Sequence, residues 1–246
     1  MSFPATAKPA PTLVTAIKAL SPSQPASRPH RVVVGISGAS GAVYALRLLR
    51  LLIERGTEVH VVVSDYGRRL LFDEAGITQL DWAQLLPGVD ERAALQASNG
   101  TAKLVIHPNK DVGAVIASGS FLHDGMVVLP CSSTSLGALA TGSGSNLLTR
   151  AAMVTLKERR PLIVCHRETP LNLIDIENMR QLTLAGAIIC PTNPGFYLNP
   201  KSIDDLVDFH VGKVLDLLKI PHSLATRWEA RTQSEREGDL NSPKGS

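Results

Sequence analysis

Aromatic residues, cysteines and long apolar runs are all scarce in this 246-residue chain. Phe, Tyr and Trp together make up only 4% of the residues, which argues against a module that stacks nucleic-acid bases on aromatic rings. No stretch approaches the roughly 18 consecutive apolar residues of a membrane-spanning helix. We therefore expect neither a nucleic-acid partner nor a membrane span.

The cysteines are three in number, Cys131, Cys165 and Cys190, and no CxxC or HxxxH spacing accompanies them. Each stands at the end of a run rich in Val, Ile and Leu. This placement is typical of small buried thiols in a reducing compartment, and the spacing predicts no metal site.

Outside the first 30 residues, neither positive nor negative charge is in excess. Lys8, Lys18 and Arg28 lie in that segment, without any acidic residue, and account for the net charge of +3. Of the 25 basic residues, these three leave 22 to balance the 22 acidic residues in the rest of the chain. A globally basic surface for nucleic acid is therefore not expected.

Proline and small polar residues dominate residues 1–30, which contain six of the 16 prolines. We expect a disordered tail there, a folded domain over residues 31–222, and a second polar tail over residues 229–246. The leader is a poor signal peptide, so a cytoplasmic location is expected. Because the leader is free of acidic residues, an organellar transit peptide is the alternative, although it holds a single arginine.

Short β-branched runs alternate with longer stretches of helical periodicity from residue 31 onward. The runs occupy residues 32–36, 59–63, 104–106, 126–129, 162–165 and 187–190. The helical stretches occupy residues 42–55, 66–75, 132–140, 146–159, 173–185 and 202–218. This alternation predicts an α/β fold with a doubly wound parallel sheet, whose ligands bind beyond the carboxyl ends of the strands.

The segment after the first predicted strand reads Gly35-Ile-Ser-Gly-Ala-Ser-Gly41, with a glycine at every third position. Such a turn lets backbone amides approach a phosphate at the start of the next helix. The spacing differs from the G-x-G-x-x-G pattern of dinucleotide-binding proteins, which disfavours NAD(P). A hydrolase nucleophile elbow around Ser40 and a merely tight turn are the remaining interpretations.

Polar residues follow the later strands as well. Four consecutive hydroxyl residues, Ser132 to Ser135, come after the fourth run, and Arg167-Glu168 follows the fifth. Tyr197 lies in a proline-rich loop after the sixth run. Arg150 and Lys157 are seven positions apart and share one face of a predicted helix. We expect these cations to gather at the ligand edge, although solvated charges and a plain Arg167–Glu168 ion pair are the alternatives.

Taken together, these motifs resemble those of a known family. The order of the motifs is that found in flavin prenyltransferases of the UbiX/Pad1 type. The motifs are GISGASGA at 35–42, PCSSTSL at 130–136, NLLTRAA at 146–152, LKERRPL at 156–162, RETPL at 167–171, P-x-x-PGFY at 191–197 and SIDDLVD at 202–208. The resemblance runs from about residue 31 to 220. It implies a flavodoxin-like (Rossmann-type) three-layer sandwich, bound FMN and a homododecamer.

The resemblance also implies an activity and a set of site residues. Members join a dimethylallyl group from dimethylallyl monophosphate to N5 and C6 of reduced FMN, and prenylated FMN then serves a UbiD-type decarboxylase. The flavin would be held by Gly38, Ala39, Ser40, Ser64, Ser132, Ser133, Thr134, Ser135 and Arg167. The prenyl phosphate would be bound by Arg150, Lys157, Arg167, Tyr197 and Lys213, and the catalytic groups would be Ser40, Glu74, Lys157 and Glu168.

No metal is expected in this reaction, because the chain lacks the Asp cluster that would chelate magnesium with a diphosphate. Three positions depart from the family pattern: Lys213 replaces an arginine, Met153 an aspartate and Thr141 a histidine. Lysine keeps the charge but lacks the guanidinium fork, so altered phosphate recognition follows. The alternatives are an FMN-dependent cysteine decarboxylase, disfavoured by PCSSTS in place of PASANT, and a non-catalytic FMN carrier.

Overall fold

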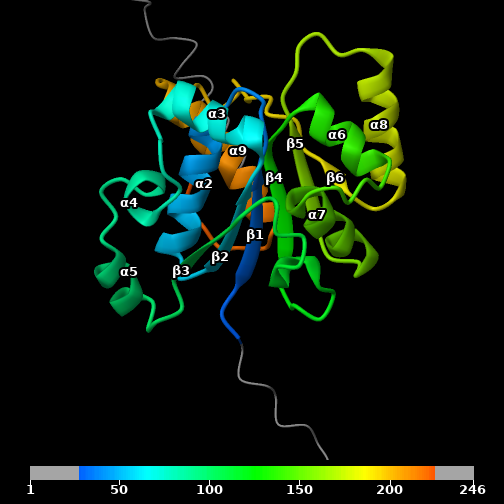
Figure 1. Ribbon diagram of the computed structural model, residues 1–246. Helices are drawn as coiled ribbons and strands as arrows, with labels where there is room; N and C mark the ends of the chain where they lie inside the picture. The colour runs from blue at the N-terminus through cyan, green and yellow to red at the C-terminus, as the bar shows by residue number, and fades with distance from the viewer. Residues whose placement is uncertain (1–27, 225–246) are drawn as a thin grey trace, which may run out of the picture.

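A six-stranded, all-parallel sheet forms the centre of the protein (Figure 1). The computed structural model describes residues 28–224. The strands are β1 (Arg31–Ile36), β2 (Glu58–Val63), β3 (Lys103–His107), β4 (Gly125–Cys131), β5 (Leu162–His166) and β6 (Ile188–Ile189), in the spatial order β3-β2-β1-β4-β5-β6. This is the doubly wound order of Rossmann-type folds, so the predicted fold class is confirmed.

The order of the strands reverses between β1 and β4, which are hydrogen-bonded neighbours. Residues 32–36 of β1 and all seven residues of β4 are buried, because helices cover both faces of the sheet at its centre. The chain leaves β1 and β4 toward opposite faces, into α2 and α6. The predicted glycine turn and the hydroxyl segment both lie at this topological switch point.

Two helical layers cover the sheet and complete the three-layer sandwich (Figure 1). One face packs against α2 (Ala42–Glu54), α3 (Asp65–Ala75) and α9 (Ile203–Leu217) around Leu48, Leu71 and Val211. The other packs against α6 (Ser133–Ala140), α7 (Leu147–Lys157) and α8 (Leu173–Leu184) around Leu136, Leu148 and Leu182. All six helices were expected from periodicity, and their bounds differ from the predicted ones by no more than two residues.

Three short elements were not predicted: α4 (Trp82–Leu85), α5 (Glu91–Ala97) and the 3-10 helix η1 (Val115–Ala117). They are too short to show a helical period in the sequence. Asp81 and Asp90 instead mark the starts of α4 and α5, because each aspartate side chain accepts a backbone N–H of the first turn. Leu85 of α4 is fully buried against the core.

The ends of the expected domain are described only in part. Arg28 to His30, the last residues of the predicted tail, lie within the described chain, and Arg28 forms an ion pair with Asp124 at 2.7 Å. The remainder of that tail and the predicted tail over residues 229–246 lie outside the described residues. Within residues 28–224, no helix is both long enough and apolar enough to cross a bilayer.

Glycines allow the start of α3 to approach the turn after β1. A Cβ atom added to Gly38 would lie 2.3 Å from the Cβ of Tyr66, and one added to Gly67 would lie 2.4 Å from the carbonyl oxygen of Ile36. Both distances are far below a normal contact, and the Gly67 clash is with backbone. The two glycines therefore fix how closely α3 lies over the carboxyl end of β1.

This close approach predicts a large cost for Gly67→Ala. The added methyl group must push α3 away from Ile36, so we expect the free energy of unfolding to fall by about 2 kcal/mol. Gly137→Ala, in α6, is the matched helical control, because its added Cβ meets only the Asn178 amide at 3.5 Å. Urea unfolding should show Gly137→Ala stabilised by about 0.5–1 kcal/mol. Equal effects of the two substitutions would contradict this account.

Candidate functional site

The buried hydroxyl of Ser37 joins the ends of β1 and β4. It donates a hydrogen bond to the carbonyl oxygen of Pro130 at 3.0 Å and accepts one from the backbone N–H of Ser132 at 2.8 Å. The glycine turn and the hydroxyl segment are thus held together at the switch point. The sequence reasoning gave Ser37 no role, although a polar residue directly after an apolar strand was a usable signal.

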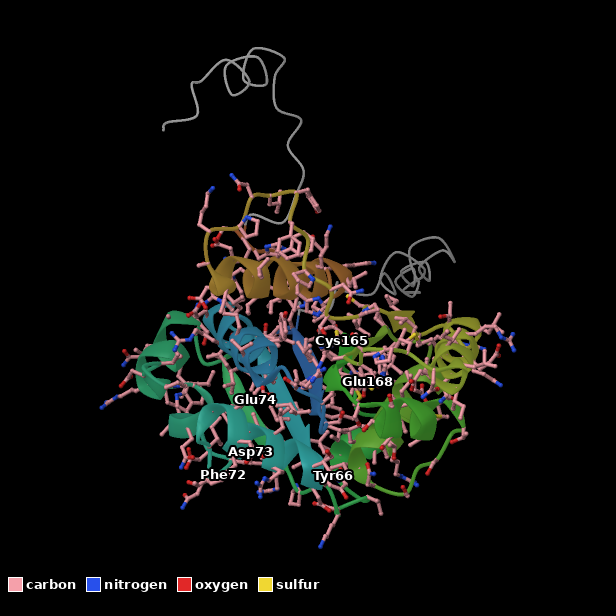
Figure 2. The ribbon with its side chains drawn as sticks, turned by 90° about the horizontal axis from the view of Figure 1, so that it is seen from above. Tyr66, Phe72, Asp73, Glu74, Cys165 and Glu168 are labelled. Atoms are coloured by element: carbon pink, nitrogen blue, oxygen red, sulfur yellow. The ribbon has the colours of Figure 1, made fainter. Side chains whose placement is uncertain are left out.

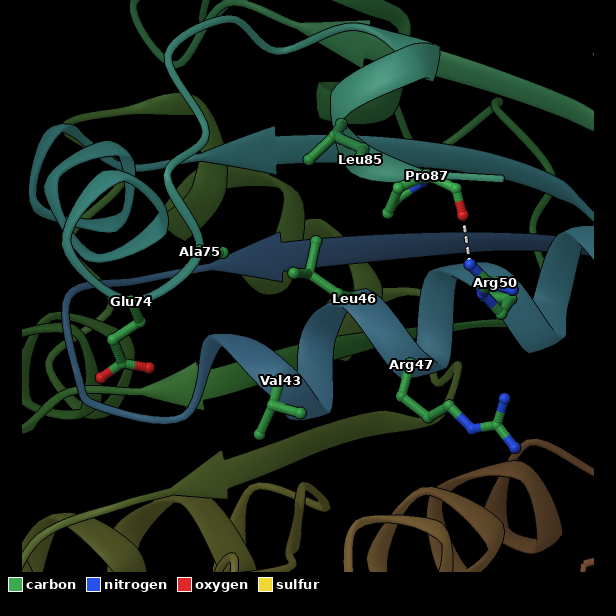
Figure 3. Close-up of a pocket in the computed structure, with 8 residues that line it drawn as sticks. All are labelled: Val43, Leu46, Arg47, Arg50, Glu74, Ala75, Leu85 and Pro87. Atoms are coloured by element: carbon green, nitrogen blue, oxygen red, sulfur yellow. Dashed lines mark hydrogen bonds between the residues drawn. The ribbon is translucent and has the colours of Figure 1, made fainter. Parts of the chain in front are cut away.

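Glu74 of α3 lies at the start of α2 (Figures 2 and 3). Its carboxylate accepts the backbone N–H groups of Gly41 at 3.0 Å and Ala42 at 2.8 Å. Burial alone would raise the pKa of Glu74, but hydrogen bonds from Ser40, Gly41 and Ala42 and the charge of Arg167 outweigh it, so the pKa lies below its ordinary value. Glu74 is therefore an anion at neutral pH.

The position of Glu74 corrects one sequence expectation. The glycine pattern assigned the first amides of α2 to a phosphate group. In the structure, the amides of Gly41 and Ala42 are taken by a carboxylate of the same chain, because an ionised side chain also suits the positive end of a helix. A phosphate at this helix start would have to displace Glu74.

Arg167 crosses from the end of β5 to the glycine turn after β1. Its Nε donates to the carbonyl oxygen of Ser40 at 3.1 Å, and its backbone N–H donates to the carbonyl of Cys131. Arg167 also lowers the pKa of Glu74. The fold therefore brings Ser40, Glu74 and Arg167 together from three separate segments. Glu168, next in the chain, is exposed, and its carboxylate accepts the N–H of Thr169 at 3.0 Å.

The hydroxyl segment divides into capping and outward-facing residues. Ser132 caps α6 by accepting the N–H of Ser135 at 3.2 Å, and their two hydroxyls also hydrogen-bond. Ser133 lies 3.2 Å from Nε2 of His166, while Thr134 is exposed. Burial lowers the pKa of His166, so its ring is neutral at pH 7. Sequence reasoning gave His166 no role.

The remaining residues of the predicted flavin set lie around the same turn. Gly38 faces Tyr66, Ala39 is buried, and Ser64 caps α3 by accepting the N–H of Gly67 at 3.0 Å. Tyr66 is 78% exposed, which is unusual for so large a ring at the centre of a sheet edge. Figure 2, which views the molecule from above, labels Tyr66, Glu74 and Glu168.

Tyr197 and Lys213 are both placed by α9. The ring of Tyr197 packs edge-on against Phe209, with centroids 5.5 Å apart, and a Cβ on Gly195 would collide with that pair. Lys213 follows Phe209 by one helical turn and is exposed. These two predicted phosphate ligands therefore lie on the β6 side of the sheet.

Lys157 does not join this group within one chain. Helix α7 runs back toward the amino ends of the strands, and Lys157 lies about 10 Å further along its axis than Arg150. Lys157 forms an ion pair with Glu158 at 2.6 Å, beside Gly119 in the segment that precedes β4. The expectation that the predicted cations gather at one edge of a single chain is thus wrong for Lys157.

A cavity of about 320 Å³ lies outside this site, between α2 and the chain from α3 to α4 (Figure 3). Apolar side chains of Val43, Leu46 and Leu85 line much of it, and Arg50 donates a hydrogen bond to the carbonyl of Pro87. Glu74 lines the cavity but directs its carboxylate to the start of α2. The cavity therefore does not contain the predicted flavin residues at the switch point.

Comparison with known proteins agrees with the fold. The flavoprotein family matches residues 20–215. Flavin prenyltransferase UbiX of Halalkalibacterium halodurans is 45% identical over 71% of this chain and 82% of its own length. Flavin prenyltransferase PAD1, mitochondrial, of Saccharomyces cerevisiae is 43% identical over 82% of this chain and 76% of its own length.

Two solved structures extend the comparison to three dimensions. AnUbiX (PadA1), in complex with FMN and dimethylallyl pyrophosphate, has a TM-score of 0.69 and 35% identity, and the match covers 82% of this chain and 98% of that one. A dodecameric, FMN-dependent UbiX-like decarboxylase from Escherichia coli O157:H7 has a TM-score of 0.67 and 35% identity, covering 81% and 99%. The family match over residues 20–215 makes the chain a flavoprotein. Within that class, the chain belongs to the flavin prenyltransferase family.

The contacts of Glu74 predict a pH-dependent contribution to stability. Because its pKa in the folded state is depressed, the contribution is present above the ordinary pKa of a glutamate and is lost as the pH falls through the lower folded value. Glu74→Gln should lower the free energy of unfolding by about 0.5–1 kcal/mol at pH 7.

Denaturant unfolding between pH 7 and pH 3 measures this effect. The difference in free energy of unfolding between the wild-type protein and Glu74→Gln should shrink as the pH falls. Asp73→Asn is the control, because the Asp73–Arg69 pair is exposed and its loss should change stability by less than about 0.5 kcal/mol. A Glu74→Gln deficit that is constant over this pH range would show that the ionised carboxylate does not stabilise α2.

Proposed function

We propose that this chain transfers a dimethylallyl group from dimethylallyl monophosphate to N5 and C6 of reduced FMN. The product would be prenylated FMN, for use by a UbiD-type decarboxylase. The observation that carries this proposal is the convergence of Ser40, Glu74 and Arg167 at the switch point of a chain that belongs to the flavin prenyltransferase family.

The residues at the switch point fit a flavin. Gly38 lets the turn after β1 lie close to α3, because a side chain there would collide with Tyr66. The exposed hydroxyl of Thr134 and the guanidinium of Arg167 offer donors to the polar edge of a planar ring system, and the Ser40 hydroxyl oxygen offers an acceptor. When bound, FMN supplies the ring atoms that receive the prenyl group. The chain orients that ring and excludes water from it.

Phosphate departure requires preorganised positive charge. Breaking the allylic C–O bond leaves a delocalised carbocation and a phosphate anion, and fixed cations stabilise the charge that develops on the phosphate. Arg167 is held by Ser40, while Lys213 and Tyr197 are placed by α9. We propose that these three groups face the phosphate from one chain. Lysine at position 213 gives a point charge rather than a bidentate contact.

The two carboxylates would divide the proton chemistry. Glu74 stays ionised because it caps α2, and it can orient the Ser40 hydroxyl that donates to it. Glu168 has only the N–H of Thr169 as a hydrogen-bond donor among the described residues, and its exposure leaves it open to a bound substrate. We propose that Glu168 transfers the proton that moves when the prenylated ring is formed.

Arg150 and Lys157 would reach a phosphate only from a second copy of the chain. Lys157 lies at the amino end of the sheet, while Arg167 lies at the carboxyl end. A closed homo-oligomer can bring these two ends together between neighbouring copies. We propose such an assembly, with the dodecamer of the Escherichia coli relative as its form.

The alternatives are a cysteine decarboxylase-like enzyme and a non-catalytic FMN carrier. The PCSSTS segment places Ser133 against His166 and leaves Thr134 exposed, which differs from the PASANT segment expected of the decarboxylases. A cytoplasmic location is part of the proposal. The mitochondrial relative from yeast makes a transit peptide the competing interpretation of the leader, which lies outside the described residues.

Mass spectrometry of the flavin tests the activity directly. Anaerobic incubation of the FMN-loaded, reduced protein with dimethylallyl monophosphate should give a flavin heavier by one C5 unit. A parallel reaction with dimethylallyl diphosphate determines which donor is preferred. We expect the monophosphate, because the chain lacks the Asp cluster that would chelate magnesium with a diphosphate. Recovery of unmodified FMN from folded protein with either donor would refute the enzyme and favour the carrier.

A site formed by two copies of the chain predicts that two inactive variants restore activity when they assemble together. Lys157→Met and Glu168→Gln should each abolish turnover, because every site then lacks one group. In co-assembled oligomers, some sites receive an intact Lys157 from one copy and an intact Glu168 from its neighbour. We expect about a quarter of wild-type activity if the copies mix at random.

The matched control co-expresses Glu168→Gln with the double variant Lys157→Met/Glu168→Gln. Every site in that mixture lacks Glu168, so activity should stay absent. Activity that is missing from both mixtures, although size measurements show mixed oligomers, would mean that Lys157 and Glu168 do not meet across a subunit boundary. The mass assay on the wild-type protein separates this result from a failure of the proposed reaction.

A further inference from the structure

Two cysteines and a histidine converge on the face of the sheet that α9 covers. Cys165 lies near the end of β5, Cys190 directly follows β6, and His210 lies in the middle of α9. Their ligand atoms, two sulfurs and one ring nitrogen, all lie within 4.8 Å of one another. This is the one such cluster of three or more His, Cys, Asp or Glu residues found in residues 28–224.

The topology explains why the sequence did not show this cluster. The N–H of Cys190 donates to the carbonyl of Val164 at 2.9 Å, which sets Cys190 beside Cys165 on the neighbouring strand. His210 comes from a third element 20 residues later in the chain. No short spacing pattern can encode a set that depends on strand pairing and on helix packing.

His210 supplies a second, independent observation. Its side chain is only 2% exposed, and its Nε2 atom has no hydrogen-bond partner among the described residues. An unsatisfied buried polar atom costs about 1–3 kcal/mol, so native structures rarely contain one without a reason. Burial also lowers the pKa of His210 to about 4, and the ring is therefore neutral at pH 7, with a lone pair available for a metal.

We propose that Cys165, Cys190 and His210 bind one Zn²⁺ ion. Two thiolates and a neutral imidazole are ligands that zinc prefers, and two thiolates neutralise the charge of the ion inside the protein. On binding, each thiol loses its proton to solvent, two Zn–S bonds and one Zn–N bond form, and no oxidation takes place. Cys190 is only half-buried, so a water molecule can take the fourth tetrahedral position.

The geometry needs only a small contraction. Zinc–sulfur bonds of about 2.3 Å and zinc–nitrogen bonds of about 2.0 Å place tetrahedral ligand atoms some 3.5–3.8 Å apart. The ligand atoms, already within 4.8 Å, reach that separation when their side chains move by about 1 Å. Thiol hydrogen bonding between Cys165 and Cys190 already holds the two sulfurs near each other.

The ion would link strand β6, at the edge of the sheet, to helix α9. Strand β6 is an edge strand with only Ile188 and Ile189 paired to β5. Zinc would tie this edge to β5 and α9 together. Lys213 lies one turn beyond His210, so the bound ion would also restrict the motion of this proposed phosphate ligand. Zinc binding itself does not depend on the proposed reaction.

Zinc binding by the purified full-length chain tests this proposal. The protein is reduced, stripped with a chelator and titrated with Zn²⁺ alone, and bound metal is counted by native mass spectrometry. We expect one ion per chain and a higher unfolding temperature with zinc than without. Substitution with Co²⁺ should give the visible and near-ultraviolet absorption of tetrahedral thiolate coordination, which needs no variant.

Cys190→Ala and His210→Phe should each weaken zinc affinity by roughly 100-fold or more. His210→Phe also removes the orphaned nitrogen, so its metal-free form should be at least as stable as the metal-free parent. Cys131→Ala is the matched control: Cys131 is a buried thiol whose side chain packs with α6 and α7, and its loss should leave affinity unchanged.

Three results would overturn the proposal. Zinc binding that persists in Cys190→Ala and His210→Phe would place the ion elsewhere. A cobalt spectrum without thiolate bands would exclude the sulfurs as ligands. A Cys165–Cys190 disulfide in the isolated protein, combined with no zinc binding after reduction, would assign the pair to redox chemistry instead.

Discussion

The contact between the ends of β1 and β4 is the constraint on which the site depends. These neighbouring strands lead to helices on opposite faces, so their backbones diverge beyond the carboxyl ends of the strands. Ser37 holds the divergence together through Pro130 and Ser132. This junction positions the glycine turn, which follows β1, and the start of α6, which follows β4. It also positions Arg167, whose backbone N–H donates to the carbonyl of Cys131.

Charge at this junction is balanced within the chain. Glu74 satisfies the amides at the start of α2, and Arg167 lies close enough to lower the pKa of the same carboxylate. An anionic substrate therefore meets a site in which one positive helix end is already neutralised. The charge left for a phosphate comes from side chains, and those of Arg150 and Lys157 lie on a helix that leads away from the site. A single chain thus holds Arg167 at this junction and Lys157 away from it.

Strand β6, at the edge of the sheet, is only weakly paired. Strand β6 contributes two paired residues, and His210 of α9, whose Nε2 atom has no hydrogen-bond partner among the described residues, lies within 4.8 Å of two thiols. None of the three residues belongs to the motifs that carry the family resemblance. Their meeting depends on how β5, β6 and α9 pack together in this fold.

The sequence by itself determined the elements and most of the carboxyl-edge residues. Apolar β-branched runs and three-to-four-residue periods are local signals, and parallel strands place whatever follows them at one edge. The sequence could not determine how far α7 places Lys157 from the carboxyl edge of the sheet, so the prediction for Lys157 was wrong. It gave no sign that Glu74 would take the amides of α2, nor that Cys165, Cys190 and His210 would meet. These contacts join residues from separate elements, and only the packing of helices on a twisted sheet decided them.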